Sequence, residues 1–150
     1  MDVPYVTLQE HFVPKRWCAW YIGRKLAALT HSLGLIPLND SIHGPQKFRA
    51  WCDEKLHAEC GWNTYKGNQG EGWHQDGDLK PGSRMDNAMV LWANRTPTEF
   101  QYNGEIYQPR PFEVVLVRNL VCHHRRPDNA PKKRFLFRQR VEVPTHINLP

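Results

Sequence analysis

TEFQYNGEIYQP, residues 98–109, consists of two short runs of alternating apolar and polar residues on either side of Asn103-Gly104. Asn-Gly is the dipeptide most typical of a two-residue hairpin turn, because both central positions require a positive φ. The stretch therefore predicts two antiparallel strands joined by a tight turn.

Similar short runs, separated by Gly, Pro and Asn, continue from residue 62 to residue 143, which is typical of strands. Eight strands are predicted, approximately WNTYK (62–66), GWHQD (72–76), AMVLWAN (88–94), TEFQY (98–102), EIYQP (105–109), FEVVLVR (112–118), LVCHH (120–124) and RFLFRQRVEV (134–143). Eight short antiparallel strands fit a jelly roll, or double-stranded β-helix, better than a βαβ fold. Small barrels of this kind keep a cavity at one mouth.

Two helices are predicted before the strands. The first begins near Pro14, which suits a first-turn position, and closes at Gly34, with apolar residues at helical spacing between them. The second begins near Pro45, carries apolar residues on one face and stops before Gly61. These helices would pack on the jelly roll.

The expected fold class is therefore α+β and mainly β. A chain of 150 residues is long enough for one domain with a substantial core. We expect a single domain over residues 1–150, in which residues 1–61 form a helical support and residues 62–143 form the jelly-roll core.

Lysine and arginine together number 20, against 15 acidic residues, which gives a formal net charge of +5. Many of the basic residues fall in short clusters: PKR (14–16), GRK (23–25), HHRRP (123–127) and KKRFLFRQR (132–140). The clusters predict an anionic partner, such as a nucleic acid. A solvated basic face explains the charge alone equally well.

The four cysteines form no Cys-x-x-Cys pair, and the first residues do not resemble a secretory signal. A reduced, cytoplasmic protein is the simplest interpretation. No apolar run approaches the roughly 18 residues that a spanning helix needs, so no membrane association through such a helix is expected. The sequence gives no indication of an oligomeric state.

NTYKGNQGEGWHQDGD, residues 63–78, contains a histidine and an aspartate one residue apart. In a strand, residues i and i+2 point to the same face, so His74 and Asp76 would present an imidazole and a carboxylate together. A facial triad for a non-haem Fe(II) oxygenase needs one more histidine from a neighbouring strand. His123 or His124 supplies it. A hydrogen-bonded turn and two exposed histidines are the alternative interpretation.

The last predicted strand gathers arginines on one face. In RFLFRQR the alternation separates two phenylalanines from Arg134, Leu136, Arg138 and Arg140. If the phenylalanines face an outer packing layer, two or three arginines face inward, which is costly unless an anion pairs with them. A dicarboxylic acid beside the metal would be such an anion. Alternatively, the sheet is open there and the arginines are hydrated or bind phosphate.

Together these residues resemble the Fe(II)/2-oxoglutarate-dependent dioxygenases, which have an HxD motif, a second histidine some tens of residues later and an arginine about ten positions beyond it. Arg134 lies ten residues after His124, which favours His124 over His123. HHRRP itself fits both an HxxxP and an HxxP version of the family signature. Within the superfamily, residues 63–78 look most like the AlkB branch, where Asn-x-Tyr precedes HxD and an acidic residue follows.

The resemblance implies a role for each matching residue. Fe(II) would be held by His74, Asp76 and His124. The cosubstrate 2-oxoglutarate would be bound by Arg134 and Arg138 together with Asn63 and Tyr65, while Asp78 would face the substrate. The closing arginines of the AlkB branch are six residues apart, whereas Arg134 and Arg138 are four apart, so the partner of each carboxylate stays open.

The activity implied is hydroxylation of a substrate by dioxygen, coupled to conversion of 2-oxoglutarate to succinate and carbon dioxide. An N-methyl substrate would be demethylated, and the AlkB likeness implies a nucleic acid or nucleotide. The region before the triad is short for the nucleotide-recognition lid of that branch. Two alternatives therefore stay open: a prolyl-hydroxylase-like oxygenase acting on a protein or small molecule, and a non-enzymatic basic jelly roll that binds nucleic acid.

Overall fold

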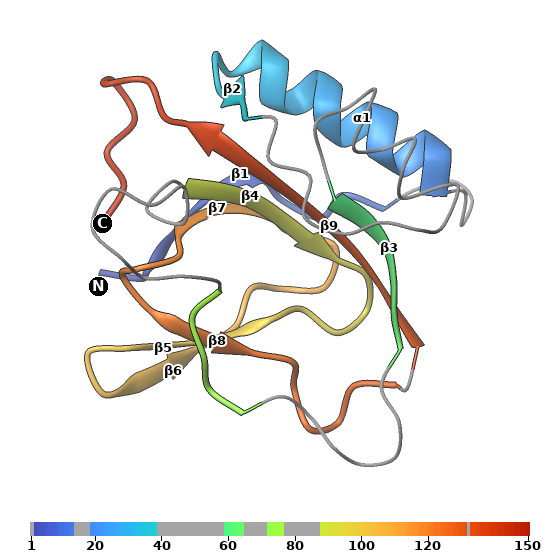
Figure 1. The fold of residues 1–150 in the computed structure, drawn as a ribbon, viewed down its shortest axis with the longest axis vertical. Coiled ribbons are helices and arrows are strands. Elements are labelled where there is room, and N and C mark those ends of the chain that lie inside the picture. Colours follow the sequence, from blue (N-terminus) through green and yellow to red (C-terminus); the bar gives the residue numbers. More distant parts are fainter. Residues whose placement is uncertain (1, 14–18, 39–58, 65–71, 77–87, 132) are drawn as a thin grey trace.

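The computed structural model describes residues 2–13, 19–38, 59–64, 72–76, 88–131 and 133–150. Over these residues the protein is mainly β, with two antiparallel sheets and one helix, α1 (Ala19–Ser32) (Figure 1). The two sheets do not join into a closed barrel within the described ranges. None of the described helical residues forms a helix both long and apolar enough to cross a membrane.

The large sheet is built around one long strand, β9 (Lys133–Glu142). Its strand order is β1-β7-β4-β9-β2, and β3 also pairs with β9. The other members are β1 (Tyr5–Gln9), β2 (Ile36–Pro37), β3 (Glu59–Thr64), β4 (Ala88–Ala93) and β7 (Val114–Arg118). Strand β4 is buried along its whole length, on both faces of the sheet. Its sequence is accordingly a continuous run of apolar residues and does not alternate between apolar and polar residues.

The small sheet has the order β6-β5-β8, formed by β5 (Glu99–Tyr102), β6 (Glu105–Tyr107) and β8 (His123–Arg125). The predicted hairpin is confirmed, since β5 and β6 pair around a turn in which Asn103 has φ 49° and Gly104 has φ 79°. Both values lie in the left-handed region that this turn requires.

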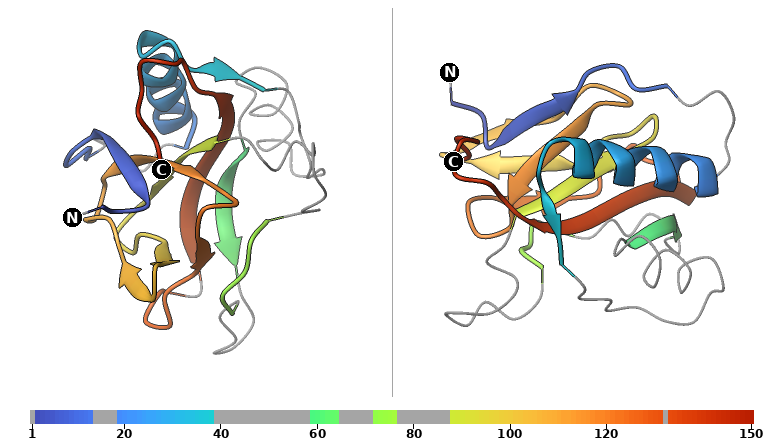
Figure 2. Two further views of the ribbon diagram at one scale, coloured as in Figure 1. Left: turned by 90° about the vertical axis from the view of Figure 1, so that its left-hand side faces the viewer. Right: turned by 90° about the horizontal axis from the view of Figure 1, so that it is seen from above.

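The core has two layers, one on each face of the large sheet. Helix α1 covers the outer face, on the side away from the small sheet (Figure 2). The outer layer includes Ile22, Leu26, Val90, Trp92, Phe135 and Phe137. The inner layer includes Met89, Leu91, Phe100, Val115, Val117 and Cys122, with Leu136 packed against it.

This division confirms the alternation predicted for residues 134–140. Phe135 and Phe137 point to the outer layer, so the residues between them point inward, toward the small sheet. The inner face of β9 therefore carries arginines opposite β8, which positions the candidate site.

The N-terminal region differs from the prediction. Only one helix lies in the described part of the chain, and it begins at Ala19. The second predicted helix falls mostly on residues 39–58, outside the described residues, and its last two positions, 59 and 60, belong to β3 instead of a helix. Strands β1 and β2 were not predicted, because a short strand gains its stability from the partner strand rather than from its own pattern.

The buried carboxylate of Glu113 links β1 to the segment before β7 through hydrogen bonds. The Glu113 side chain is 5% exposed and accepts hydrogen bonds from Thr7 Oγ1 at 3.3 Å, Arg110 N at 3.0 Å and Arg110 Nη2 at 3.2 Å. Thr7 Oγ1 and Arg110 N lose this acceptor if the carboxylate is removed, whereas Arg110 Nη2 also contacts Glu10 Oε2 at 3.0 Å. We therefore expect Glu113→Ala to lower the free energy of unfolding by about 1–3 kcal/mol in urea denaturation. Glu142→Ala, at an exposed glutamate, should change it by less than about 0.5 kcal/mol; equal effects would contradict this account.

Candidate metal centre

The segment 72–76, predicted as a strand, is joined to β8 by a single isolated bridge and is not a strand of the small sheet. His74 and His124 form an antiparallel bridge, in which His74 N donates to His124 O at 3.1 Å and His124 N donates to His74 O at 2.9 Å. A pair joined by both backbone hydrogen bonds is held in fixed register. Two histidines that are far apart in the sequence are thereby placed side by side, with ring centroids 4.5 Å apart.

Three donor atoms converge at this bridge. The distance from His124 Nε2 to Asp76 Oδ1 is 3.2 Å, and that from His74 Nε2 to the same oxygen is 3.5 Å. One potential ligand atom from each residue lies within 4.8 Å of the other two. Two imidazole nitrogens and one carboxylate oxygen form the ligand set of a facial triad, which leaves other coordination positions for exogenous ligands.

The tautomer of His74 suits metal binding. Its Nδ1 lies 2.7 Å from the carbonyl oxygen of Gly72. A carbonyl oxygen can only accept, so Nδ1 is the donor in this contact and Nε2 is the ring nitrogen that faces Asp76. A hydrogen bond of this kind to the non-ligating nitrogen is the usual support of a metal-bound histidine.

Asp76 is held in its ionised form. Arg138 Nη1 donates to Asp76 Oδ2 at 2.6 Å, and each of the two side chains is 15% exposed. Burial by itself would raise the pKa of Asp76, but the hydrogen bond with His124 and the charges of Arg138, His124 and His74 together hold it well below its ordinary value. Oδ2 is thus engaged by Arg138, and Oδ1 faces the histidines.

Cys122 is buried in the inner layer and is not among the three residues whose donor atoms converge. Burial raises the pKa of its thiol to about 12, so the thiol stays protonated at neutral pH. We expect alkylation of Cys122 by iodoacetamide at pH 8, followed by peptide mass spectrometry, to be slow in the folded protein and fast in urea. Rapid alkylation before unfolding would contradict the packing between the sheets.

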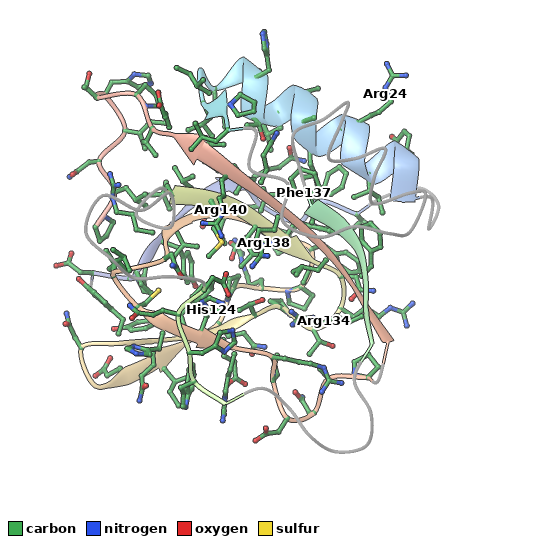
Figure 3. All side chains as sticks on the ribbon, viewed as in Figure 1. Arg24, His124, Arg134, Phe137, Arg138 and Arg140 are labelled. Carbon is green, nitrogen blue, oxygen red and sulfur yellow. The ribbon has the colours of Figure 1, made fainter. Side chains whose placement is uncertain are left out.

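Three arginines of β9 face the small sheet. Figure 3 shows Arg134, Arg138 and Arg140 on the side of the strand where His124 lies, while Phe137 points toward α1. Arg134 is 3% exposed and donates to two neutral acceptors, Thr96 O at 3.0 Å and Thr98 Oγ1 at 3.2 Å. A buried guanidinium group on this face is a candidate binding group for a carboxylate or another anion.

The structure distinguishes between the two adjacent histidines, since His124 is buried and faces Asp76, whereas His123 is exposed. Among the predicted cosubstrate residues, Arg138 contacts Asp76 directly. Asn63 is described only through its strand, where it lies opposite Arg134 in the register of β3 and β9. Tyr65 and Asp78 lie outside the described residues.

Two residues of the site were absent from the predicted set. Arg140 is 4% exposed and stands on the inner face with Arg134 and Arg138; the alternation indicated its orientation, and the six-residue spacing from Arg134 could have selected it. Asn119, in the turn after β7, binds the backbone of Asp76 at 2.8 and 2.9 Å. No sequence pattern signals a contact of this second kind.

Comparison of the chain with protein-family models, with curated proteins and with solved structures finds no match.

Proposed function

We propose that the protein is an Fe(II)- and 2-oxoglutarate-dependent dioxygenase of the AlkB-like kind, which hydroxylates or demethylates a nucleic acid or nucleotide. The observation that carries the proposal is the convergence of His74, Asp76 and His124 opposite the arginine-bearing face of β9. A metal-binding triad and inward-facing arginines serve different chemical needs. Their occurrence on facing sheets is what an enzyme that uses a metal and a dicarboxylate requires.

The order of the strands supports a double-stranded β-helix. From β3 onward, consecutive segments lie in the large sheet (β3), beside the small sheet (72–76), and in the large sheet (β4). They continue through the small sheet (β5 and β6), the large sheet (β7), the small sheet (β8) and the large sheet (β9). A chain that winds between two facing antiparallel sheets in this way is typical of jelly rolls.

The residues present fit an iron ion. His74 Nε2, His124 Nε2 and Asp76 Oδ1 would hold it, the Gly72 carbonyl keeps the His74 ring oriented, and Arg138 keeps the carboxylate ionised. Bound Fe(II) would supply the redox chemistry by which dioxygen, 2-oxoglutarate and a C–H substrate give succinate, carbon dioxide and a hydroxylated product. The facing sheets would shield this chemistry from bulk water.

For the cosubstrate we assign a carboxylate of 2-oxoglutarate to Arg134. Its planar, charged guanidinium can bind a carboxylate through two parallel hydrogen bonds, and it lies buried on the face that carries Arg138. Arg138 is engaged by Asp76, so its main effect is on the metal ligand. Arg140 has the six-residue spacing from Arg134 that the AlkB branch shows between its closing arginines, and it supplies further positive charge on this face.

Charge supports a nucleic acid as the substrate class. The chain carries a net charge of +5, and the cluster HHRRP includes both His124 and the exposed face of β8. On the same strand the Arg125 guanidinium, whose Nε also contacts Glu99 Oε2 at 3.0 Å, lies over the Trp73 ring, 4.4 Å from its centroid. Basic and aromatic side chains close to a catalytic metal are the groups that bind phosphate and stack on bases.

The proposal is tested by turnover. Protein supplied with Fe(II), ascorbate and 2-oxoglutarate should form succinate, and the rate should rise with N-methylated single-stranded oligonucleotides but not with proline-containing peptides. Formaldehyde should be released in proportion to succinate when the oligonucleotide is present. A rate that rises with peptides alone would exclude the nucleic-acid substrate. A protein that neither binds nor consumes 2-oxoglutarate would exclude the dioxygenase.

A further inference from the structure

A buried asparagine is bound to the backbone of Asp76. Asn119 follows β7, 43 positions from Asp76, and is 1% exposed. Its Oδ1 accepts a hydrogen bond from Asp76 N at 2.8 Å, and its Nδ2 donates one to Asp76 O at 2.9 Å. The side-chain amide therefore satisfies both backbone groups of the residue, as an adjacent strand would.

The segment 72–76 is consequently held from two sides. On one side the His74–His124 bridge pairs it with β8. On the other side Asn119 binds Asp76, and its own backbone oxygen accepts a hydrogen bond from Gln75 Nε2 at 3.3 Å. The bridge fixes the backbones of His74 and His124, and the contacts with Asn119 fix the backbone of Asp76.

We propose that Asn119 is a positioning residue that sets the place of Asp76 in the metal centre. This inference rests on the metal site of the proposed function. Arg138 holds Oδ2 of the carboxylate, and Asn119 fixes the backbone from which the carboxylate projects. With both ends held, Oδ1 is directed at the two histidines before any ion arrives. A metal site requires its ligands to be held to within about 0.5 Å, so a mobile Asp76 would bind metal weakly.

The chemistry of the contact requires an asparagine. One donor and one acceptor must lie side by side to match the N–H and the C=O of a single residue, and a primary amide offers this pair. Aspartate at this position keeps the shape and the acceptor but loses the donor. Its carboxylate would then repel the carbonyl oxygen of Asp76.

The test compares Asn119→Ala and Asn119→Asp with the wild-type protein by anaerobic titration with Co(II), followed through its visible absorption. Both variants should bind Co(II) about 10- to 100-fold more weakly, the usual cost of removing a group that supports a metal ligand, and should give an altered absorption spectrum. The added charge of Asn119→Asp would by itself attract a cation, so weaker binding by this variant reports displacement of Asp76.

Thr30→Ala is the control for a loss of stability alone. Thr30 is fully buried, and its hydroxyl donates to Leu26 O at 2.8 Å within α1, on the other side of the large sheet. This variant should unfold more easily yet bind Co(II) with the wild-type affinity and spectrum. If Asn119→Ala does not fold, the isosteric Asn119→Asp decides the question.

The outcomes separate this inference from the proposed function. If the Asn119 variants bind Co(II) with the affinity and spectrum of the wild type, the positioning role is overturned and the metal site stands. If the wild-type protein itself binds no Co(II), the metal site and the positioning role are both overturned.

Discussion

His124→Ala is expected to abolish binding of Fe(II) and turnover of 2-oxoglutarate. The substitution removes Nε2, one of three donor atoms that face each other across the site, and two remaining donors do not hold the ion. The loss in kcat/KM should exceed the about 10- to 100-fold that accompanies removal of a group supporting a ligand. Succinate formation and the bound iron per protein chain measure the two effects. His74→Ala should behave in the same way.

The neighbouring residue offers a matched control. His123 is exposed, adjacent in sequence and identical in chemistry, but it points away from Asp76. His123→Ala should therefore retain iron binding, and the formation of succinate measured without an oligonucleotide, within about twofold, as expected for a surface substitution away from the metal site. If His123→Ala loses the metal and His124→Ala keeps it, the site has been assigned to the wrong face of β8.

Arg134→Ala should raise the KM for 2-oxoglutarate about 10- to 100-fold, because a charge-assisted hydrogen bond is worth about 1.5–3 kcal/mol. Iron binding in the absence of cosubstrate should be preserved, since Arg134 is not one of the three residues whose donor atoms converge. Steady-state kinetics at varied 2-oxoglutarate gives the KM, and an iron assay gives the metal content.

Two further variants serve as controls for the KM of Arg134→Ala. Arg134→Lys keeps the charge but loses the planar fork, so its KM should lie between those of the wild type and the alanine variant. Arg24→Ala removes an exposed arginine of α1, remote from the site, and should leave the KM unchanged (Figure 3). An unchanged KM in Arg134→Ala would exclude this residue from cosubstrate binding.

The parts of the fold that sequence analysis could predict are those that local chemistry determines. Asn103 and Gly104 predicted the hairpin because their positive φ values are a property of two residues. The orientation of the two faces of β9 could also be predicted, because Phe135 and Phe137 alternate with residues on the other face and need an apolar layer to cover them. The cover itself, α1, was predicted from its own helical pattern.

The candidate site was predictable to a similar extent. The spacing of His74 and Asp76 brought the two together, and the distance from His124 to Arg134 favoured the buried histidine of the pair. The contacts that tune the site were not predictable. Arg138 meets Asp76 because the two sheets face each other, and Asn119 meets Asp76 through a turn far along the chain. Contacts of this kind join segments that are distant in the sequence, so no periodic pattern of residues indicates them.

The most direct test of the central proposal is an anaerobic titration of 2-oxoglutarate into the Fe(II)-loaded protein. In the absence of dioxygen no turnover occurs, and chelation of the iron by the cosubstrate should produce a saturable metal-to-ligand charge-transfer band in the visible spectrum. The band should be absent from His124→Ala and present in His123→Ala. If the wild-type protein binds Fe(II) but develops no band at any 2-oxoglutarate concentration, the site is not that of a 2-oxoglutarate-dependent dioxygenase.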